Sequence, residues 1–369
     1  MLVSPVMTLL ASTAFILLKR SASFLPSSVR VSSPRSSWLK KETRTLSMTI
    51  FTTSEKDEEV VQSMLYRIRQ CNYMPQEARK SMVEFVVEGA SVGKCTTKVA
   101  DLLCRSSPSE PVFQLQSIDG KKQLSLTEYA GLTKETRTDA VMTVMEKLRS
   151  EGVIDGWRDE LYPLSSSFYS EPLLLVERAA APFLGIKQYG VHINGIVKNE
   201  NGENDMWMAR RSKTKSKYPG MLDQIVAGGQ PHGFGLTENV IKECMEEAGI
   251  PEDMAVQGLQ AAGVVSYEDF EEHPSDLVDG IFQTVILFNY DLHLPKDFIP
   301  IPMDGEVDHF FKWTMKDVLE SMHPNYHDPI KPNCYLCIID YLLRNGLGVS
   351  METKGYLDVF RELRSGDCS

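Results

Sequence analysis

The chain has 369 residues, of which 42% are hydrophobic and 24% charged, a composition typical of a soluble globular protein with one large domain or two ordinary ones. Its net charge of −11 disfavours general binding to nucleic acid or to an anionic membrane, because an acidic chain repels phosphate at long range. We therefore expect no nucleic-acid polymer as partner and no stable membrane insertion. A phosphate-bearing ligand would need a bound cation or a few placed basic side chains.

Residues 1–50 are predicted to be a targeting segment, because Glu42 is the first acidic residue and an apolar run precedes a stretch rich in Ser and Arg. The apolar run, "PVMTLLASTAFILL", is too short to span a bilayer comfortably. The following "SASFLP" resembles the cleavage region of two-part plastid signals, and a plain chloroplast or mitochondrial presequence fits almost as well. We expect a plastid protein, with the mitochondrion as the alternative.

Residues 51–185 are predicted to form a mostly helical α+β helper domain. Helical spacing of apolar residues occurs in "EEVVQSMLYRIRQCN", and "PQEARKSMVEFVVEG" is interpreted as a second helix from Pro75 to Gly89. Two further helices are expected in "SLTEYAGLTKETRTDAVMTVMEKLRSEG", followed by short strand-like or turn segments in "WRDELYPL" and "PLLLVERAAAPFLG". This region shows no catalytic constellation of its own.

A second domain is predicted over residues 186–350, with a C-terminal helix and tail over 351–369. The β-branched segment "YGVHINGIV" predicts a strand, "NENGEN" a turn, and Met206–Ala209 the next strand. This hairpin leads into a dense basic cluster: Arg210, Arg211, Lys213, Lys215 and Lys217. The cluster is interpreted either as a solvated loop or as a phosphate contact.

The next segment, "VAGGQPHGFGLTENVIKECMEEAGI", places a glycine-rich loop before an acidic helix. We expect the helix to run from Glu238 to Ala248, with Thr237 as its N-cap and Gly249 just past its end. Three carboxylates, those of Glu243, Glu246 and Glu247, share one face at spacings of three and four residues. Like charges at this spacing repel, and carboxylates are the ligands of Mg²⁺ or Mn²⁺. The segment therefore predicts a divalent metal site, with a solvent-exposed acidic helix as the alternative.

The spacing of Gly228, Lys242-Glu243, Glu246-Glu247 and Gly249-Ile250 resembles the Nudix box. Two positions depart from that pattern: Lys242 replaces the usual arginine, and Phe234 stands in place of an early glutamate. Lysine keeps a positive charge near the glutamates but lacks the planar guanidinium fork. The lost glutamate leaves one accessory metal contact in doubt.

Further segments, including "WMARRSKTKSKYPGMLDQIVAGGQPHG", "DGEVDHFFKW" and "KPNCYLCIIDYLLRNG", are similar to Nudix proteins related to the C-terminal part of fungal thiamine pyrophosphokinase fusions, and to plant chloroplast Nudix hydrolases. The resemblance implies an α+β fold, an α/β/α sandwich with a mixed sheet, behind a helper domain. It implies hydrolysis of a diphosphate joined to an organic group. Oxo and oxy derivatives of thiamine diphosphate are the expected substrates, and 8-oxo-dGDP is the alternative.

The same resemblance implies roles for individual residues. Glu243 and Glu247 would be metal ligands, Glu246 would bind a second metal or position water, and a carbonyl of Gly228 or Gly229 would add a ligand. Glu306, with Asp304 as its substitute, is expected to be the general base, or else a surface acid at a strand edge. The remaining residues expected to contact the substrate are Arg210, Arg211, Lys217, Gly228, Gly229 and His232.

Other interpretations stay open at this point. A degenerate Nudix fold could bind a ligand without turnover, and a homodimer is compatible with a helper domain that supplies a surface. Prenyl diphosphate isomerase chemistry is disfavoured, because no cysteine occurs in a matching context. Cys334 and Cys337 form a CxxC within an apolar run and are interpreted as buried helix residues rather than a redox or metal pair.

Overall fold

The computed structural model describes residues 55–107 and 109–368, so the predicted targeting segment lies outside the described residues. Its N-terminal part contains a four-stranded sheet in the order β2-β1-β4-β3, in which β1 and β4 are parallel and the other neighbours antiparallel. The sheet consists of β1 (Met82–Val87), β2 (Ala90–Thr96), β3 (Phe113–Ile118) and β4 (Lys121–Leu126). Helices α3 (Thr97–Arg105) and α4 (Lys134–Ser150) contribute to its core.

The prediction of one helix from Pro75 to Gly89 is wrong. Helix α2 (Gln76–Ser81) ends after six residues, and β1 follows it directly. In β1 the buried side chains alternate, at Val83, Phe85 and Val87, which is the period of a strand with one face on a core. The β-branched and aromatic composition of "MVEFVV" was the available signal.

Of the two helices predicted after Ser125, only the second is confirmed. The first is a single 3₁₀ turn, η1 (Glu128–Ala130), closed by Gly131 at a φ of +85°. The second is α4, which begins at a capping box formed by Thr133 and Thr136. After α4 come the short antiparallel hairpin of β5 (Leu161–Leu164) and β6 (Leu174–Glu177), then α5 (Ala181–Leu184).

The second half is built on a larger mixed sheet with the central order β11-β12-β7-β8-β13. β7 and β12 are parallel, and β10 and β9 pair with β7 and β8 respectively. The predicted strands Tyr189–Val197 and Met206–Ala209 are confirmed as parts of β7 and β8. The strands are β7 (Lys187–Lys198), β8 (Asn204–Arg211), β9 (Leu222–Gln224), β10 (Val226–Gly229), β11 (Leu259–Glu271), β12 (Ile281–Leu294) and β13 (Val307–Thr314).

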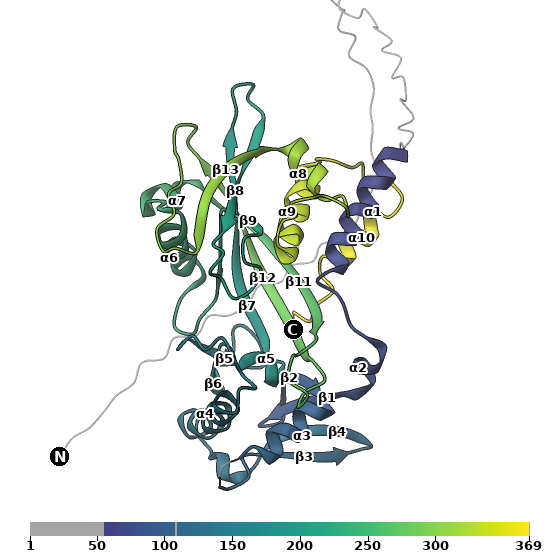
Figure 1. Cartoon of the computed structure of the whole chain (residues 1–369), viewed down its shortest axis with the longest axis vertical. Coiled ribbons are helices and arrows are strands. Elements are labelled where there is room, and N and C mark those ends of the chain that lie inside the picture. The colour runs from purple at the N-terminus through teal and green to yellow at the C-terminus, as the bar shows by residue number, and fades with distance from the viewer. Residues whose placement is uncertain (1–54, 108, 369) are drawn as a thin grey trace, which may run out of the picture. The chain divides into compact units, whose positions relative to one another are not determined.

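Helices cover both faces of this sheet, which confirms the predicted α/β/α sandwich (Figure 1). On one face, α6 (Leu236–Ala248) packs Val240 and Cys244 against Val191 and Ile193 of β7, and α7 (Glu252–Gly258) follows it. The other face carries α8 (Met315–Ser321) and α9 (Pro332–Arg344). Both cysteines of the CxxC are fully buried in α9, as expected. A last helix, α10 (Tyr356–Glu362), lies in the predicted C-terminal segment.

The first described helix, α1 (Glu55–Arg69), packs with the C-terminal helices rather than with the N-terminal sheet. Its Met64 and Ile68 share a core with α9 and with Val359 of α10. The buried Arg67 donates hydrogen bonds to the carbonyls of residues 321, 322 and 323, where α8 ends. This cation satisfies carbonyls that a helix leaves unpaired at its C-terminus.

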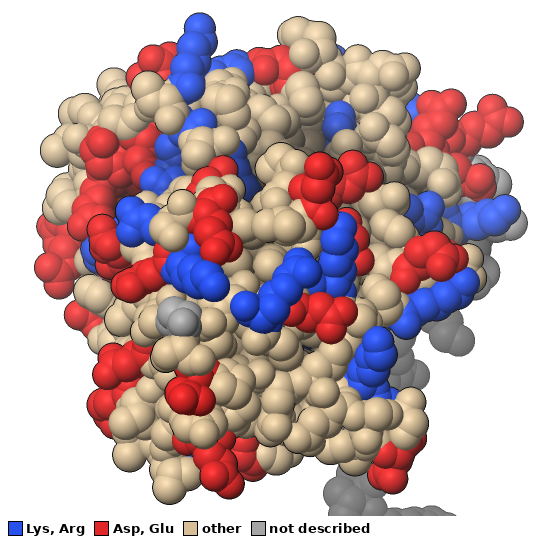
Figure 2. Space-filling view, turned by 60° about the horizontal axis from the view of Figure 1, so that its bottom comes forward, with Lys and Arg blue, Asp and Glu red and all other residues tan. Residues whose placement is uncertain are grey.

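Among the helices that the structure describes, none combines the length and the apolar character needed to cross a bilayer. The face of the molecule seen in Figure 2 carries basic and acidic side chains interspersed. This mixture agrees with exposed ion pairs such as Arg69–Glu362 and Lys217–Glu271.

Candidate active site

The candidate site lies where β10, the glycine loop and α6 meet. β10 pairs with β7 through Gly229, and the chain then turns through residues 230–235 into the helix. The predicted cap is wrong: Gly235, not Thr237, is the N-cap, and the Glu238 carboxylate accepts a hydrogen bond from its backbone N–H at 3.3 Å. Gly249 ends the helix in the left-handed conformation, as expected. Asn239 fixes the loop by donating to the carbonyl of Gly229 at 2.7 Å.

Two of the predicted carboxylates reach back from α6 onto β10. Glu247 is only 7% exposed, and its Oε2 accepts a hydrogen bond from the backbone N–H of Ala227 at 3.1 Å. Glu243, one turn earlier, lies against Gly228, where an added Cβ would be 2.7 Å from the carboxylate Oε1. Any side chain at position 228 would therefore displace Glu243, so the close approach of strand and carboxylate requires glycine.

The electrostatics of these two carboxylates are unfavourable without a cation. Burial raises the pKa of Glu247 well above its usual range, and the charge of Glu243 adds to the rise. Burial likewise raises the pKa of Glu243, with further contributions from Glu246 and Glu306, although Lys242 opposes them. Perturbed carboxyls held close together in this way are typical of functional sites.

Glu246 does not join the other two glutamates. Its carboxylate is half exposed and accepts a hydrogen bond from Lys242 at 2.7 Å, one helical turn away. The same ammonium lies 3.3 Å from Glu243, so Lys242 links two of the three predicted ligands. Among the described residues, no three carboxylate, imidazole or thiol groups lie together as a preformed metal cluster.

The residues present nevertheless fit a hard divalent cation. Glu243 and Glu247 supply carboxylate oxygens on one face of α6, and their contacts with Gly228 and Ala227 place the backbone of β10 beside them. The charge of such an ion would offset the burial and the neighbouring negative charges that raise the pKa of both glutamates. Their donor set is that of Mg²⁺ or Mn²⁺, which prefer oxygen ligands.

Glu306, the predicted general base, precedes β13 and makes an ion pair with Lys215 at 2.5 Å. Burial alone would raise the pKa of Glu306, but the hydrogen bond and charge of Lys215, together with Arg211 and Arg178, lower it overall. Glu306 also contributes to the raised pKa of Glu243, so its charge acts on the site. Asp304 instead accepts a hydrogen bond from the backbone N–H of Glu306 and shapes the turn.

Arg210 and Arg211 extend in different directions, because adjacent residues of a strand face opposite sides of the sheet. Arg211 pairs with the buried Asp223 at 2.5 Å, and its charge acts on both Glu306 and Glu247. Arg210 pairs with Asp328 at 2.5 Å and has no described link to the glutamates of α6. The structure therefore brings only one of the two arginines to the site.

The remaining predicted substrate contacts are distributed differently. Lys217 is exposed and pairs with Glu271 at the end of β11, at 2.7 Å. His232 is an exposed loop residue whose backbone N–H donates to the carbonyl of Leu161 at 3.2 Å. The glycine loop is therefore attached to β5 of the N-terminal part.

A second buried carboxylate, Asp223 of β9, lies behind the site. It pairs with Lys331 at 3.1 Å as well as with Arg211, and it accepts a hydrogen bond from the Cys334 thiol at 2.7 Å. Burial would raise the pKa of Asp223, but these two cations hold it well below its usual range. Next to it, burial lowers the pKa of His192 to about 4, so this histidine is neutral.

Two residues of the N-terminal part reach the site, although the sequence analysis did not identify them. An added Cβ on Gly229 would lie 3.3 Å from Tyr162 Cζ and 3.4 Å from Arg178 Cζ. The guanidinium of Arg178 is 5.6 Å from the centre of the Tyr162 ring. No local pattern marks these residues, because the contact joins segments distant in the sequence.

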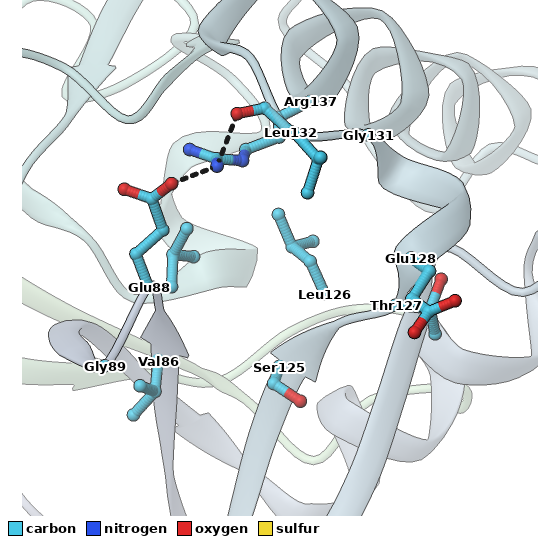
Figure 3. A pocket seen from close by; sticks show the side chains of 11 residues that line it. Val86, Glu88, Gly89, Ser125, Leu126, Thr127, Glu128, Gly131, Leu132 and Arg137 are labelled. Carbon is cyan, nitrogen blue, oxygen red and sulfur yellow. Dashed lines mark hydrogen bonds and ion pairs between the residues drawn. The ribbon is translucent and has the colours of Figure 1, made fainter.

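A separate hollow of about 280 Å³ lies in the N-terminal part, lined by residues of β1, β4 and α4 (Figure 3). Its arginine, Arg137, is already engaged by the Glu88 carboxylate and the Leu132 carbonyl, as the dashed lines in Figure 3 show. None of the residues that line this hollow comes from β10 or α6.

Two family models match successive parts of the chain. Residues 63–188 match a domain of unknown function, DUF4743, and residues 188–334 match the NUDIX domain. The chain is 40% identical to Nudix hydrolase 20, chloroplastic, of Arabidopsis thaliana, over 82% of this chain and 78% of that protein. It is 45% identical to Nudix hydrolase 24, chloroplastic, of the same plant, over 64% of this chain and 61% of that protein.

Similarity extends to solved structures and to yeast. The NUDIX domain of Shewanella oneidensis NrtR, complexed with ADP ribose, is 11% identical over 43% of this chain and 88% of that chain, with a TM-score of 0.31. The uncharacterized protein YJR142W of Saccharomyces cerevisiae is 38% identical over 56% of this chain and 60% of that protein. The NUDIX match and the extended match to Nudix hydrolase 20 together place this chain in the Nudix hydrolase family.

Proposed function

We propose that this chain hydrolyses a diphosphate joined to an organic group, with Mg²⁺ or Mn²⁺ as its cofactor. The observation that carries the proposal is that Glu243 and Glu247 of α6 both lie against β10, where each carboxyl has a raised pKa. A site that only exposed an acidic helix face would leave these carboxylates in water, with no close contact to Gly228. Members of the Nudix family generally use divalent metals, which agrees with this cofactor.

In this proposal the chain's own residues hold the cation and the water. Glu243 and Glu247 would bind the ion, with the carbonyl of Gly228 or Gly229 as a further ligand, and Glu246 would position water or a second ion. A bound cation would supply charge neutralisation on the phosphoryl oxygens and a lower pKa for water. The lowered pKa of Glu306 keeps this carboxylate ionised at neutral pH, so that it can accept a proton from the attacking water.

The organic group is proposed to be thiamine or a close relative, and in particular its oxo and oxy forms. This choice rests on the resemblance of the segments quoted above to Nudix proteins related to thiamine pyrophosphokinase fusions. The product would be the monophosphate, released together with phosphate. The alternative substrate is an oxidised nucleoside diphosphate, 8-oxo-dGDP.

The experiment that tests the function is phosphate release from a panel of diphosphates with Mg²⁺ or Mn²⁺. We expect turnover of oxothiamine diphosphate to exceed that of thiamine diphosphate and of 8-oxo-dGDP. A higher rate with 8-oxo-dGDP would replace the thiamine assignment but keep the reaction. Tight binding without turnover of any member would instead support a non-catalytic ligand-binding Nudix module.

We also propose a plastid location, because two relatives are named chloroplastic and residues 1–50 are predicted to be a targeting segment. Fusing residues 1–50 to a fluorescent reporter tests this proposal. A plastid signal supports it, a mitochondrial signal supports the alternative, and a diffuse cytosolic signal contradicts both. A homodimer stays a prediction, which sedimentation velocity of the protein tests.

A further inference from the structure

The β5–β6 hairpin of the N-terminal part lies beside the glycine loop. We propose that this hairpin completes the hydrolase site, with Arg178 binding the diphosphate of the substrate and Tyr162 supporting the guanidinium. The inference rests on the proposed function for the identity of the ligand. It assigns to the domain of unknown function the task of supplying a substrate-binding residue.

The position of the hairpin is fixed by contacts with the larger sheet. The carbonyl of Leu161 accepts a hydrogen bond from the N–H of His232, which ties β5 to the glycine loop. In the connection between β5 and β6, the ring of Phe168 lies 4.8 Å from that of Tyr189 and 4.9 Å from that of Phe288. Aromatic pairs at these distances add packing energy beyond simple burial. The hairpin therefore packs against β7 and β12.

The chain on either side of Arg178 is held by a buried acid. Glu177 is 1% exposed, and its carboxylate accepts hydrogen bonds from three backbone N–H groups, those of Arg158, Glu160 and Ala179. A buried carboxylate that accepts several N–H bonds acts as a rigid brace between segments. It fixes the backbone immediately before and after Arg178. The arginine is thus presented from a constrained position.

The guanidinium of Arg178 keeps donors available for a ligand. Its Nη1 donates to Glu160 at 2.8 Å, and among the described residues its Nη2 and Nε make no hydrogen bond. The side chain is 44% exposed, so the unused edge can reach solvent. A planar fork with two free N–H directions suits the oxygens of a phosphate group.

The charges around Arg178 are those of a phosphate site beside a metal site. Its guanidinium contributes to the lowered pKa of Glu306. The charge of Glu243 contributes to the raised pKa of the nearby Tyr162 hydroxyl. Burial raises the pKa of Tyr162 to about 12, so the hydroxyl keeps its proton as a donor. Both residues touch the position of Gly229. A diphosphate bridging Glu243 and Glu247 through a cation would therefore lie within the field of Arg178.

Four of the five basic residues of the upstream cluster are less available, and the fifth, Lys213, is exposed and has no described contact with the glutamates of α6. Each of four basic side chains already pairs with a carboxylate, in the pairs Arg210–Asp328, Arg211–Asp223, Lys215–Glu306 and Lys217–Glu271. Arg211 is also held through Nη2 and Nε by backbone carbonyls. Arg178, whose guanidinium has Glu160 as its one hydrogen-bond acceptor in the described part of the chain, is the better candidate for the terminal phosphate.

The test compares Arg178→Gln and Arg178→Lys with Arg149→Gln as a matched control. Arg149 belongs to the same N-terminal part and stacks on Trp157 at 4.6 Å, with no described contact to the glycine loop. Binding of methylenediphosphonate, a diphosphate analogue that resists hydrolysis, is measured by calorimetry with Mg²⁺. Steady-state kinetics with the best diphosphate of the panel and thermal melting accompany it.

We expect Arg178→Gln to weaken binding of the analogue about tenfold to a hundredfold and to raise KM, because a hydrogen bond between charged groups is lost. Arg178→Lys should fall between Gln and wild type, and Arg149→Gln should match wild type, with melting temperatures unchanged in all three. Wild-type affinity and KM in Arg178→Gln would overturn the inference and leave the proposed function standing.

Two other outcomes separate the inference from the function. If wild type binds the analogue but turns over no diphosphate, and Arg178→Gln binds it more weakly, the inference holds and the proposed hydrolysis fails. If wild type neither binds the analogue nor hydrolyses any diphosphate, both are overturned.

Discussion

Two buried carboxylate centres lie in the same half of the molecule and differ in their compensation. Asp223 lies between Lys331 and Arg211, and these cations hold its pKa well below its usual range. Glu247 is buried to a similar degree, but its one hydrogen-bond partner among the described residues is a backbone N–H, and its pKa is raised. Burial alone therefore does not decide the state of a carboxyl; the neighbouring charges do.

This difference in compensation assigns a structural role to Asp223 and the proposed metal-binding role to Glu247. A buried acid with its own cations, such as Asp223, forms a network that links β9 to α9 and requires no bound ion to neutralise its charge. A buried acid paired with a second acid gains from an external cation. Arg211 borders both centres, since it pairs with Asp223 and its charge acts on Glu306. The comparison predicts opposite consequences when each carboxylate is neutralised.

The largest effect is expected at the uncompensated centre. Glu247→Gln should lower kcat with any diphosphate substrate by at least about a hundredfold, because even outer partners of a metal site are worth ten- to a hundredfold. Stability should be kept or slightly increased, since the amide oxygen can still accept the bond from Ala227 without the cost of a buried charge. Phosphate release and urea unfolding measure the two effects. Full activity in this variant would remove the glutamate from the site.

The compensated centre should respond in the reverse way. Asp223→Asn leaves Lys331 and Arg211 as unpaired buried cations, so unfolding should become easier by about 3–5 kcal/mol. Urea denaturation followed by circular dichroism checks this value. The surface acid of the Lys217–Glu271 pair provides a control, and Glu271→Gln should cost at most about 1 kcal/mol. Equal losses in the two variants would contradict the proposed network.

The two centres also differ in acid. The folded pKa of Asp223 lies below its unfolded value of about 3.9, so its contribution to stability is fully present above about pH 4 and is lost as the pH falls further. Wild type should therefore lose stability below about pH 4 more steeply than Asp223→Asn. Urea midpoints at intermediate pH values measure the slope. Parallel slopes would show that Asp223 is not depressed in the folded state.

Metal ions should stabilise the folded chain through the uncompensated centre. Mg²⁺ or Mn²⁺ at a hundred times its dissociation constant adds about 2.7 kcal/mol, which thermal melting detects as a rise of several degrees. Glu243→Gln and Glu247→Gln should reduce this rise, whereas Glu271→Gln should keep it. An equal rise in all four proteins would place the metal elsewhere.

The smallest expected effect concerns the partner of Arg178. Glu160→Gln removes the carboxylate that engages its Nη1, in a pair that is partly exposed. Methylenediphosphonate should then bind more tightly, by up to about fivefold, because the ligand no longer competes with Glu160. Calorimetry with Mg²⁺ measures the change. Weaker binding would show that Glu160 positions the arginine rather than competing for it.

Local patterns were sufficient for two strands and the acidic helix of the second domain. The strands around Tyr189–Val197 and Met206–Ala209 follow from β-branched and apolar composition, and the acidic helix from its glycine loop and Gly249. The error over Pro75–Gly89 arose because a short helix leads directly into a strand, so a single period was assigned to two elements. The N-cap was predicted at Thr237 because Gly235, the N-cap in the structure, has no side-chain oxygen that would mark it as a capping residue.

The arrangement of the site itself could be predicted only in part. The helical face of Glu243 and Glu247 was visible in the sequence, but the diversion of Glu246 to Lys242 depends on side-chain rotamers. The side chains of Arg210 and Arg211 point to opposite faces of the sheet. Strand alternation predicts this once β8 is known to extend to Arg211. The approach of Arg178 could not, because tertiary packing of Phe168 on β7 and β12 produces it.

The packing of α1 constrains how the chain can be shortened. Arg67 caps the end of α8, and Met64 and Ile68 fill a core shared with α9, although α1 precedes the N-terminal sheet in the sequence. A truncated protein that starts after Arg69 would expose this apolar surface of the hydrolase half to water, and among the described contacts it would leave the Met322 carbonyl without its donor. Expression of the second half by itself should therefore yield aggregates, while a chain that lacks only residues 1–50 keeps the contacts of α1 with α8, α9 and α10.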